Sequence, residues 1–393
     1  MKRVLQVLLI ISVLFINNVK AFEINSKNAI LINLNEDTIL YEKNSEENTK
    51  IASLTKIMTA MVVLDTVDNL DKKVTLTSDD FKGLKEEHAA VAGFRIGQIV
   101  SYRDLLYGLL LPSGADAANA ISRNLSGSKE AFIELMNRKA KELKMNNTYF
   151  VNTTGLDKEG QKATVKDISI LFKYALKNDE FVKIIKSNSY TTSDQTLTFK
   201  STLKSKKDNL KMNYLLGGKT GTTYDAGLCL ASIASYNDVD YMLVTTNAPY
   251  GKDPLNFIDA KTIYDYYMSN YSYKILVKKN DKLVTIKTKN STKDEIVFKS
   301  NKEVKKYLDN NYKEENVKLK YSGLEEISYK NKLGEKIGKV DVYYNNEKID
   351  TINIILNDKL KFDLKKYLLN NIYIVIIAIV LIIGLLIIIK KKN

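Results

Sequence analysis

Three short motifs, in a fixed order along the sequence, carry hydroxyl and amine groups suited to nucleophilic catalysis. Ser53 and Lys56 form an S-x-x-K motif. Ser113 begins the segment Ser-Gly-Ala, and Lys219 begins the segment Lys-Thr-Gly. A serine hydroxyl becomes a strong nucleophile when a neighbouring base takes its proton. The motifs therefore point to acyl transfer, with Ser53 as the candidate nucleophile and Lys56 as its base.

The spacing of Ser53 and Lys56 has a physical reason. Residues three apart on a helix are neighbours, so the amine of Lys56 can reach the hydroxyl of Ser53. Lysine is protonated in water, but burial and a second cation, here Lys219, both disfavour the charged form. The start of a helix also presents unpaired N–H groups and a positive dipole end, which suit an oxyanion.

The S-x-x-K pattern alone is weak, because the stretches that begin at Ser126 and Ser201 match it as well. The context of Ser53 differs. Residues 51–61 form an apolar, helix-forming stretch, so we expect the start of this helix to be buried beneath a sheet.

The other two motifs supply groups for proton transfer and binding. The hydroxyl of Ser113 both donates and accepts, so it can relay a proton between Lys56 or Lys219 and a leaving amine. Lys219 and Thr220 can hold a carboxylate by charge and hydrogen bond. Gly221 leaves room for a substrate backbone to approach this strand.

The composition excludes several other chemistries. The chain has one histidine, His88, and one cysteine, Cys229. A Ser-His-Asp triad and a zinc site are both hard to build from so few ligands, and an intramolecular disulfide cannot form. We therefore expect no metal and no cofactor. The net charge is +14, but the lysines are spread along the chain, which argues against a nucleic-acid partner.

Both ends of the sequence carry targeting signals. Residues 1–21 begin with Lys2 and Arg3, continue with an apolar segment and reach a small residue at Ala21, as a signal peptide does. Residues 372–389 form an unbroken apolar run, which spans roughly 27 Å at about 1.5 Å per residue. Three lysines follow at 390–392, and positive charge favours the cytoplasmic side. We expect a protein on the extracytoplasmic face of the cell membrane, held by residues 366–393.

The part between these signals reads as two domains. Residues 22–270 alternate strand and helix patterns, with hairpin signals at both ends, so an α+β fold with an antiparallel sheet flanked by helices is expected. Helices are predicted to begin at Ser101 and Thr164. Residues 271–365 show the polar–apolar alternation of half-buried strands, for example over 282–288, 315–321 and 338–344, which predicts a small β-rich domain.

The three motifs, their order and their surroundings resemble the low-molecular-weight penicillin-binding proteins, which are serine D-alanyl-D-alanine carboxypeptidases. The segments 107–118, 150–156, 219–223 and 226–230 also resemble this family. The resemblance implies a β-lactamase/transpeptidase-like fold, a peptidoglycan stem peptide ending in D-Ala-D-Ala as substrate, and β-lactams as covalent inhibitors.

The resemblance also implies roles for individual residues. Ser53 is the acylated nucleophile and Lys56 the base, while Ser113 and Lys219 assist proton transfer. Thr220 binds the terminal carboxylate, and the backbone N–H groups of Ser53 and Thr222 form the oxyanion hole. By contrast, we expect Asn152 and Gly155 to shape a loop, Asp116 to be a buried hydrogen-bonding residue, and Cys229 to be a buried strand residue.

One position departs from the family pattern: Ala115 stands where relatives carry Asn. Asn119, four residues later, is no obvious substitute. Two groups of alternatives remain open at this point. One is a related D,D-endopeptidase or β-lactamase, and the other is a weakly active peptidoglycan-binding scaffold, which Ala115 makes conceivable.

Overall fold

The computed structural model describes residues 22–392 of the chain. The predicted signal peptide, residues 1–21, lies outside the described residues. Contacts divide the chain into two compact units, with the boundary between Tyr267 and Met268. We describe each unit by itself.

The first unit is built on one five-stranded sheet with strand order β2-β1-β9-β8-β7, in which neighbouring strands are antiparallel. Its strands are β1 (Asn28–Asn33), β2 (Thr38–Lys43), β7 (Leu215–Thr223), β8 (Gly227–Tyr236) and β9 (Val239–Ala248). The amino-terminal hairpin pairs with the last of the three later strands, so the ends of this unit meet within one sheet. The predicted antiparallel sheet is therefore confirmed.

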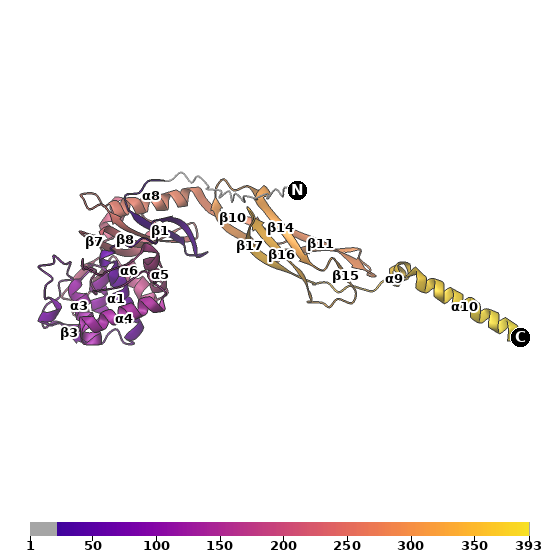
Figure 1. Cartoon of the computed structure of the whole chain (residues 1–393), viewed down its shortest axis with the longest axis horizontal. Coiled ribbons are helices and arrows are strands. Elements are labelled where there is room, and N and C mark those ends of the chain that lie inside the picture. Colours follow the sequence, from indigo (N-terminus) through magenta and orange to yellow (C-terminus); the bar gives the residue numbers. More distant parts are fainter. Residues whose placement is uncertain (1–21, 393) are drawn as a thin grey trace, which may run out of the picture. The chain divides into compact units, whose positions relative to one another are not determined.

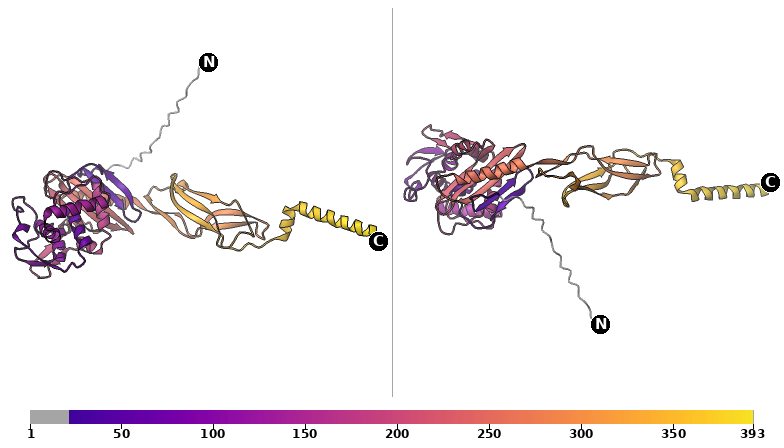
Figure 2. Two further views of the ribbon diagram at one scale, coloured as in Figure 1. Left: turned by 60° about the horizontal axis from the view of Figure 1, so that its bottom comes forward. Right: turned by 90° about the horizontal axis from the view of Figure 1, so that it is seen from above.

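Helices cover both faces of this sheet. Figures 1 and 2 show α8 (Leu255–Asn270) along one face, and Figure 1 shows α1 (Thr55–Thr66), α3 (Ala115–Ser126), α4 (Lys129–Glu142), α5 (Val165–Ala175) and α6 (Asp179–Lys186) on the opposite side. The unit also contains α2 (Tyr102–Leu110) and α7 (Lys204–Asn209). Helix α1 is buried along most of its length and packs in the main hydrophobic core. Helix α1 and the face of the sheet on which it packs together enclose the first candidate motif, which contains Ser53 and Lys56.

The predicted helix starts at Ser101 and Thr164 are confirmed. The Ser101 hydroxyl accepts from Asp104 N while the Asp104 carboxylate accepts from Ser101 N, which is a capping box. Thr164 accepts from Asp167 N in the same way at the start of α5. Short elements complete the unit: β3 (Lys73–Thr75), β4 (Ile99–Ser101), β5 (Ser189–Thr191), β6 (Thr198–Lys200), and the 3-10 turns η1 (Ala52–Leu54) and η2 (Ser78–Asp80).

The second unit is rich in β-strands, as predicted. Its strands are β10 (Tyr271–Val277), β11 (Lys282–Lys289), β12 (Glu295–Lys299), β13 (Val304–Asp309), β14 (Val317–Gly323), β15 (Glu326–Ser328), β16 (Lys336–Tyr344) and β17 (Glu347–Ile355). They form a pair β10-β13 and two three-stranded sheets, β12-β11-β15 and β14-β16-β17. The β11–β15 pairing is parallel and the others are antiparallel.

One predicted strand boundary is wrong. The strand expected over 315–321 begins only at Val317, because residues Glu314–Asn316 form the 3-10 turn η3. After β17 come the short helix α9 (Leu364–Asn370) and α10 (Ile372–Lys392). Within residues 22–392, one helix is long and apolar enough to cross a membrane, over Ile372–Lys391.

Candidate active site

Ser53 lies in the 3-10 turn η1, directly before α1. The preceding residue, Ala52, has a left-handed φ of 46°, which is unfavourable for a residue with a side chain. Strand β7 passes close to this turn, since a Cβ added to Gly221 would lie 3.1 Å from Ser53 N. The turn therefore brings Ser53 to the edge strand of the sheet, and Gly221 permits the close approach.

Lys56 lies one turn further along and meets Ser53 as the spacing predicts. Its Nζ is 3.0 Å from Ser53 Oγ and donates to the carbonyl oxygen of Thr154 at 2.6 Å. The Lys56 side chain is buried. Burial lowers the pKa of Lys56 to about 7, although the carboxylate of Asp116 acts in the opposite direction. An amine with this pKa is neutral in a substantial fraction of molecules near neutral pH, and only the neutral amine can accept a proton.

Ser113 and Lys219 form a second serine–lysine pair. Lys219 Nζ donates to Ser113 Oγ at 2.9 Å and to the carbonyl oxygen of Thr220 at 2.7 Å. Lys219 is fully buried, and burial, together with the charge of Lys56, lowers its pKa well below the usual value. The electrostatic coupling of the two lysines indicates that the two pairs lie close together, although 106 residues separate Ser113 from Lys219 in sequence.

The two other S-x-x-K stretches are not arranged in this way. Ser126 Oγ donates to the carbonyl oxygens of Ser122 and Ser128, and Ser201 Oγ accepts from Leu203 N. In the part of the chain that the structure describes, neither hydroxyl is hydrogen-bonded to a lysine amine.

The loop at residues 152–156 supplies the carbonyl group that holds Lys56. Asn152 Oδ1 accepts from Thr154 N and Gly155 N, and its Nδ2 donates to Leu156 O. Gly155 has a φ of +81°, and a Cβ there would lie 1.9 Å from Ala52 O. The expected loop-shaping role of Asn152 and Gly155 is confirmed. The contact of Thr154 O with Lys56 was not predicted, because a backbone acceptor leaves no residue-type signal in a sequence.

Comparison with known proteins agrees with this geometry. Residues 16–250 match the profile of the Peptidase S11 family, described as D-alanyl-D-alanine carboxypeptidase. The chain belongs to this family. It is 29% identical to the D-alanyl-D-alanine carboxypeptidase DacF of Bacillus subtilis over 335 residues, which cover 80% of this chain and 82% of the relative. It is also 32% identical to a D-alanyl-D-alanine endopeptidase of Pseudomonas aeruginosa over 245 residues, covering 61% and 76% of the two chains.

Solved structures support the fold assignment. A mutant of a Streptomyces DD-transpeptidase superposes with a TM-score of 0.58 at 29% identity, covering 63% of this chain and 98% of that one. Penicillin binding protein 5 from Haemophilus influenzae has a TM-score of 0.64 at 21% identity, covering 86% and 98%, and is a likeness in fold alone. Since the S11 peptidases are serine hydrolases, the protein is an enzyme of the D-alanyl-D-alanine carboxypeptidase and endopeptidase class.

Asp116 links the start of α3 to the neighbouring loop of this S11 peptidase. Its carboxylate accepts from the backbone N–H groups of Ala92, Gly93 and Phe94. The expected role as a buried hydrogen-bonding residue is thus confirmed. The adjacent Ala115 is also buried, and its N–H donates to the carbonyl of Ala90.

Thr220 and Thr222 lie on the edge strand β7, on either side of Gly221. Thr220 Oγ1 is hydrogen-bonded to Thr202 Oγ1 at 2.8 Å, and Thr222 Oγ1 donates to Gly221 O. Both threonines line a cleft of about 600 Å³ that extends toward α7 and the start of α8. The two threonines are therefore accessible from solvent. The side chain of Lys219, which also belongs to β7, is buried in the core.

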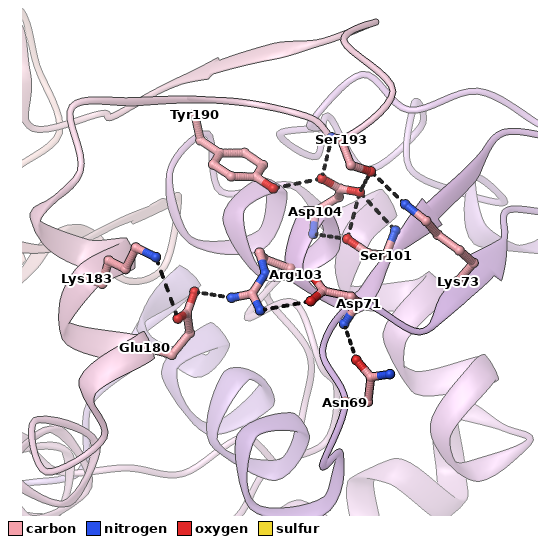
Figure 3. A network of polar contacts seen from close by, with 10 residues as sticks. All are labelled: Asn69, Asp71, Lys73, Ser101, Arg103, Asp104, Glu180, Lys183, Tyr190 and Ser193. Atoms are coloured by element: carbon pink, nitrogen blue, oxygen red, sulfur yellow. Dashed lines mark hydrogen bonds and ion pairs between the residues drawn. The ribbon is translucent and has the colours of Figure 1, made fainter.

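A buried polar network holds the hairpin β5–β6, which leads into Thr202. Figure 3 shows its centre, the carboxylate of Asp104, which accepts from the hydroxyls of Ser101, Ser193 and Tyr190. Burial acts to raise the pKa of Asp104, but the hydrogen bonds from Ser101 and Ser193 outweigh it and the pKa is lowered. The network therefore ties the hairpin to the start of α2.

The single cysteine and the single histidine of the chain are not part of the candidate site. Cys229 is buried on β8, and burial raises the pKa of its thiol to about 12, so it is inert near neutral pH. His88 is exposed. Among residues 22–392, no group of three or more His, Cys, Asp or Glu side chains is arranged to hold a metal ion.

Proposed function

We propose that this protein is a secreted, membrane-anchored serine D,D-carboxypeptidase that removes the terminal D-Ala from peptidoglycan stem peptides. The proposal rests on one observation above all. In an S11 scaffold, the Ser53 hydroxyl lies 3.0 Å from a buried amine whose pKa is about 7. Inhibition by β-lactams follows from the same chemistry, because a β-lactam acylates the nucleophile that the peptide acylates.

In the first half-reaction, Ser53 Oγ attacks the carbonyl carbon of the penultimate D-Ala and Lys56 takes the hydroxyl proton. The backbone N–H groups of Ser53 and Thr222 stabilise the resulting oxyanion. The C–N bond then breaks, and the proton that Lys56 took passes to the leaving amine through Ser113, which is hydrogen-bonded to Lys219, so that Lys56 is neutral again. The products are free D-Ala and an ester of Ser53.

In the second half-reaction, water attacks this ester with Lys56 again as the base, and the shortened peptide leaves. Thr220 holds the terminal carboxylate before the first step. The 2.8 Å bond from Thr202 fixes the Thr220 hydroxyl on the side of the cleft, where a carboxylate can reach it.

The proposed organisation assigns residues 22–270 to catalysis, 271–365 to a β-rich domain and 366–393 to a membrane anchor. The signal peptide at residues 1–21 directs the catalytic domain to the extracytoplasmic face. Helix α10 supports the anchor by its length and apolar composition, and Lys390 and Lys391 at its carboxyl end support a cytoplasmic carboxyl end.

The test of the catalytic assignment is to incubate the full-length protein with a fluorescent penicillin and to map the labelled residue by mass spectrometry. We expect a penicilloyl adduct on Ser53, loss of the adduct in Ser53→Ala, and release of D-Ala from a peptide ending in D-Ala-D-Ala. A label on Ser126 or Ser201 would show that another serine is the nucleophile.

The anchor is tested separately by ending the chain at Leu364. The full chain should fractionate with membranes, whereas the shortened chain should be soluble and still bind penicillin. Retention of the shortened chain in the membrane fraction would contradict the anchor.

A second candidate is a D,D-endopeptidase, favoured by the 32% identity to the endopeptidase of Pseudomonas aeruginosa. A cross-linked peptide dimer distinguishes the two activities, since only an endopeptidase converts it to monomers.

A further inference from the structure

The loop at residues 152–158 contacts two sides of the candidate site. At one end, Thr154 O accepts from the amine of Lys56 at 2.6 Å. Three residues later, Asp157 Oδ1 accepts from the hydroxyl of Thr223 at 2.7 Å, and Thr223 is the last residue of β7. The same short loop therefore holds both the candidate base and the end of the edge strand, and no step of the proposed mechanism uses the second contact.

Asp157 holds the turn between β7 and β8 with both of its carboxylate oxygens. While Oδ1 accepts from the Thr223 hydroxyl, Oδ2 accepts from Asp225 N at 3.1 Å. The Thr223 oxygen in turn accepts from Ala226 N at 3.1 Å. A hydroxyl that donates to a carboxylate and accepts from a backbone N–H is fixed in orientation, and hydrogen bonds to a charged acceptor are stronger than neutral ones. The turn is therefore held in one place relative to the loop.

The turn that Asp157 holds begins one residue after Thr222. This step rests on the proposed function, in which the backbone N–H groups of Ser53 and Thr222 bind the oxyanion. Strand β7 lies at the edge of the sheet and pairs there with β8, so its end needs further contacts to keep its place beside the Ser53 turn. A Cβ at Gly221 would lie 3.1 Å from Ser53 N, which shows how closely the two donor segments approach.

The loop is also tied to the chain around the Ser53 turn. Lys50 Nζ donates to Lys158 O at 3.1 Å, and a Cβ at Gly155 would lie 1.9 Å from Ala52 O. The loop thus rests against residues 50–53 on one side and is bonded to the β7–β8 turn on the other. A connection of this kind sets the distance between the two oxyanion donors.

We infer that Asp157 is a positioning residue for the oxyanion hole, which sets the place of Thr222 N relative to Ser53 N through its bonds to the β7–β8 turn. It acts through the turn and takes no part in proton transfer. Asp157 is exposed, so its replacement removes the bonds to the turn without opening a cavity in the core.

The experiment uses Asp157→Ala in the full-length protein in detergent and measures two quantities. One is the second-order rate of acylation by a fluorescent penicillin. The other is the affinity for a boronic acid that mimics the substrate, because its tetrahedral adduct with a serine hydroxyl reports on the oxyanion site without turnover. Removal of one oxyanion donor costs about 10²- to 10³-fold. Asp157→Ala displaces a donor and does not remove it, so we expect both quantities to fall by about 10-fold.

Two further readouts separate positioning from a general loss of structure. The pH midpoint of acylation, which Lys56 sets, should not move in Asp157→Ala, because the contact of Thr154 with Lys56 is kept. Thr223→Val removes the hydroxyl partner, and the loss that it causes should be smaller in the Asp157→Ala background than in the natural protein. Glu159→Ala, at an exposed acidic residue two positions further on, is the matched control and should change neither quantity.

A parallel fall of acylation and boronic acid affinity in Asp157→Ala, with Glu159→Ala unchanged, supports the inference. Unchanged acylation, a fall in acylation without a fall in boronic acid affinity, or independent losses from Asp157→Ala and Thr223→Val overturns it. If thermal unfolding shows that Asp157→Ala is unfolded, Asp157→Asn carries the test, since it keeps one acceptor oxygen and should show a smaller fall in both quantities. If the natural protein forms no penicillin adduct on Ser53, the proposed function itself has failed; a normal adduct with no effect of Asp157→Ala refutes the positioning role alone.

Discussion

The rate of acylation by penicillin should follow the titration of Lys56. The amine must be neutral to take the proton of Ser53, and burial places its pKa at about 7. Because the protonated form is the inactive one, acylation should be lost as the pH falls through this value and should reach a plateau above it. A lysine with its ordinary pKa, about 10.4, would instead give a rate that still rises at pH 9.

The size of the effect follows from the fraction of neutral amine. With a pKa of about 7, this fraction is about one tenth at pH 6 and about nine tenths at pH 8. The second-order rate of acylation should therefore increase about 10-fold over these two units and change less than about 1.2-fold above pH 8.

The assay is stopped-flow acylation of the full-length protein by a fluorescent penicillin, with thermal unfolding measured at each pH to confirm that the fold persists. Lys56→Met keeps the length of the side chain and removes the base, so it should slow acylation by about 10²- to 10⁴-fold. Lys72→Met, at an exposed lysine, should leave both the rate and the profile unchanged. A flat profile, or a midpoint near 10 in the natural protein, would refute the assignment of Lys56 as the neutral base.

Three further predictions concern the residues around the site. Gly155→Ala should cost about 2–4 kcal/mol of stability and slow acylation, because its Cβ would collide with Ala52 O. The control is Gly127→Ala, which has the same φ of +81° but lies in open space and should cost only about 1–2 kcal/mol. Equal losses of stability in thermal unfolding would contradict the argument. Ala115→Asn should speed penicillin acylation by about 10- to 100-fold by restoring an amide hydrogen bond worth roughly 1.5–3 kcal/mol; if the natural protein is inert and this change restores nothing, the scaffold alternative holds. Asp104→Ala should lower the free energy of unfolding by about 1–3 kcal/mol, since it leaves buried donors unpaired. The pKa of Asp104 is lowered in the fold, so this loss should be full above about pH 4 and should shrink in more acidic solution as Asp104 protonates; an equal loss at all pH values would argue against an ionised Asp104.

The sequence predicted the parts of the site that are local or that depend on residue type. Ser53 and Lys56 are three residues apart, so the single turn that leads from η1 into α1 brings them together. The Ser113–Lys219 pair joins residues 106 positions apart, and only the order of the motifs and the family resemblance indicated it. The carbonyl of Thr154 could not be predicted, because every residue has a backbone carbonyl and the choice of one depends on the fold of the 152–156 loop.

The same distinction applies to the fold. The capping residue Ser101 and the alternating strands were predicted from short patterns, whereas the parallel β11–β15 pair was not. Strand β15 has only three residues, too few for a clear alternation, and its partner is set by the tertiary fold. The further partners of Asp104, Tyr190 and Ser193, lie more than 80 residues away in sequence, so its local capping role was visible while its role in the hairpin was not.

The two serine–lysine pairs share one design, which explains how a site with two buried amines can perform base catalysis. Each amine lies between a serine hydroxyl and a backbone carbonyl: Lys56 between Ser53 and Thr154, and Lys219 between Ser113 and Thr220. Within residues 22–392, no carboxylate hydrogen-bonds to either amine. A carboxylate in contact would hold a lysine in its charged form, whereas neutral acceptors in a buried site leave the cost of desolvation uncompensated and favour the neutral amine. Asp116 is a counter-charge that acts on Lys56, and three backbone N–H groups already bind its carboxylate. The site thus keeps Lys56 basic enough to accept a proton yet neutral enough to do so near pH 7.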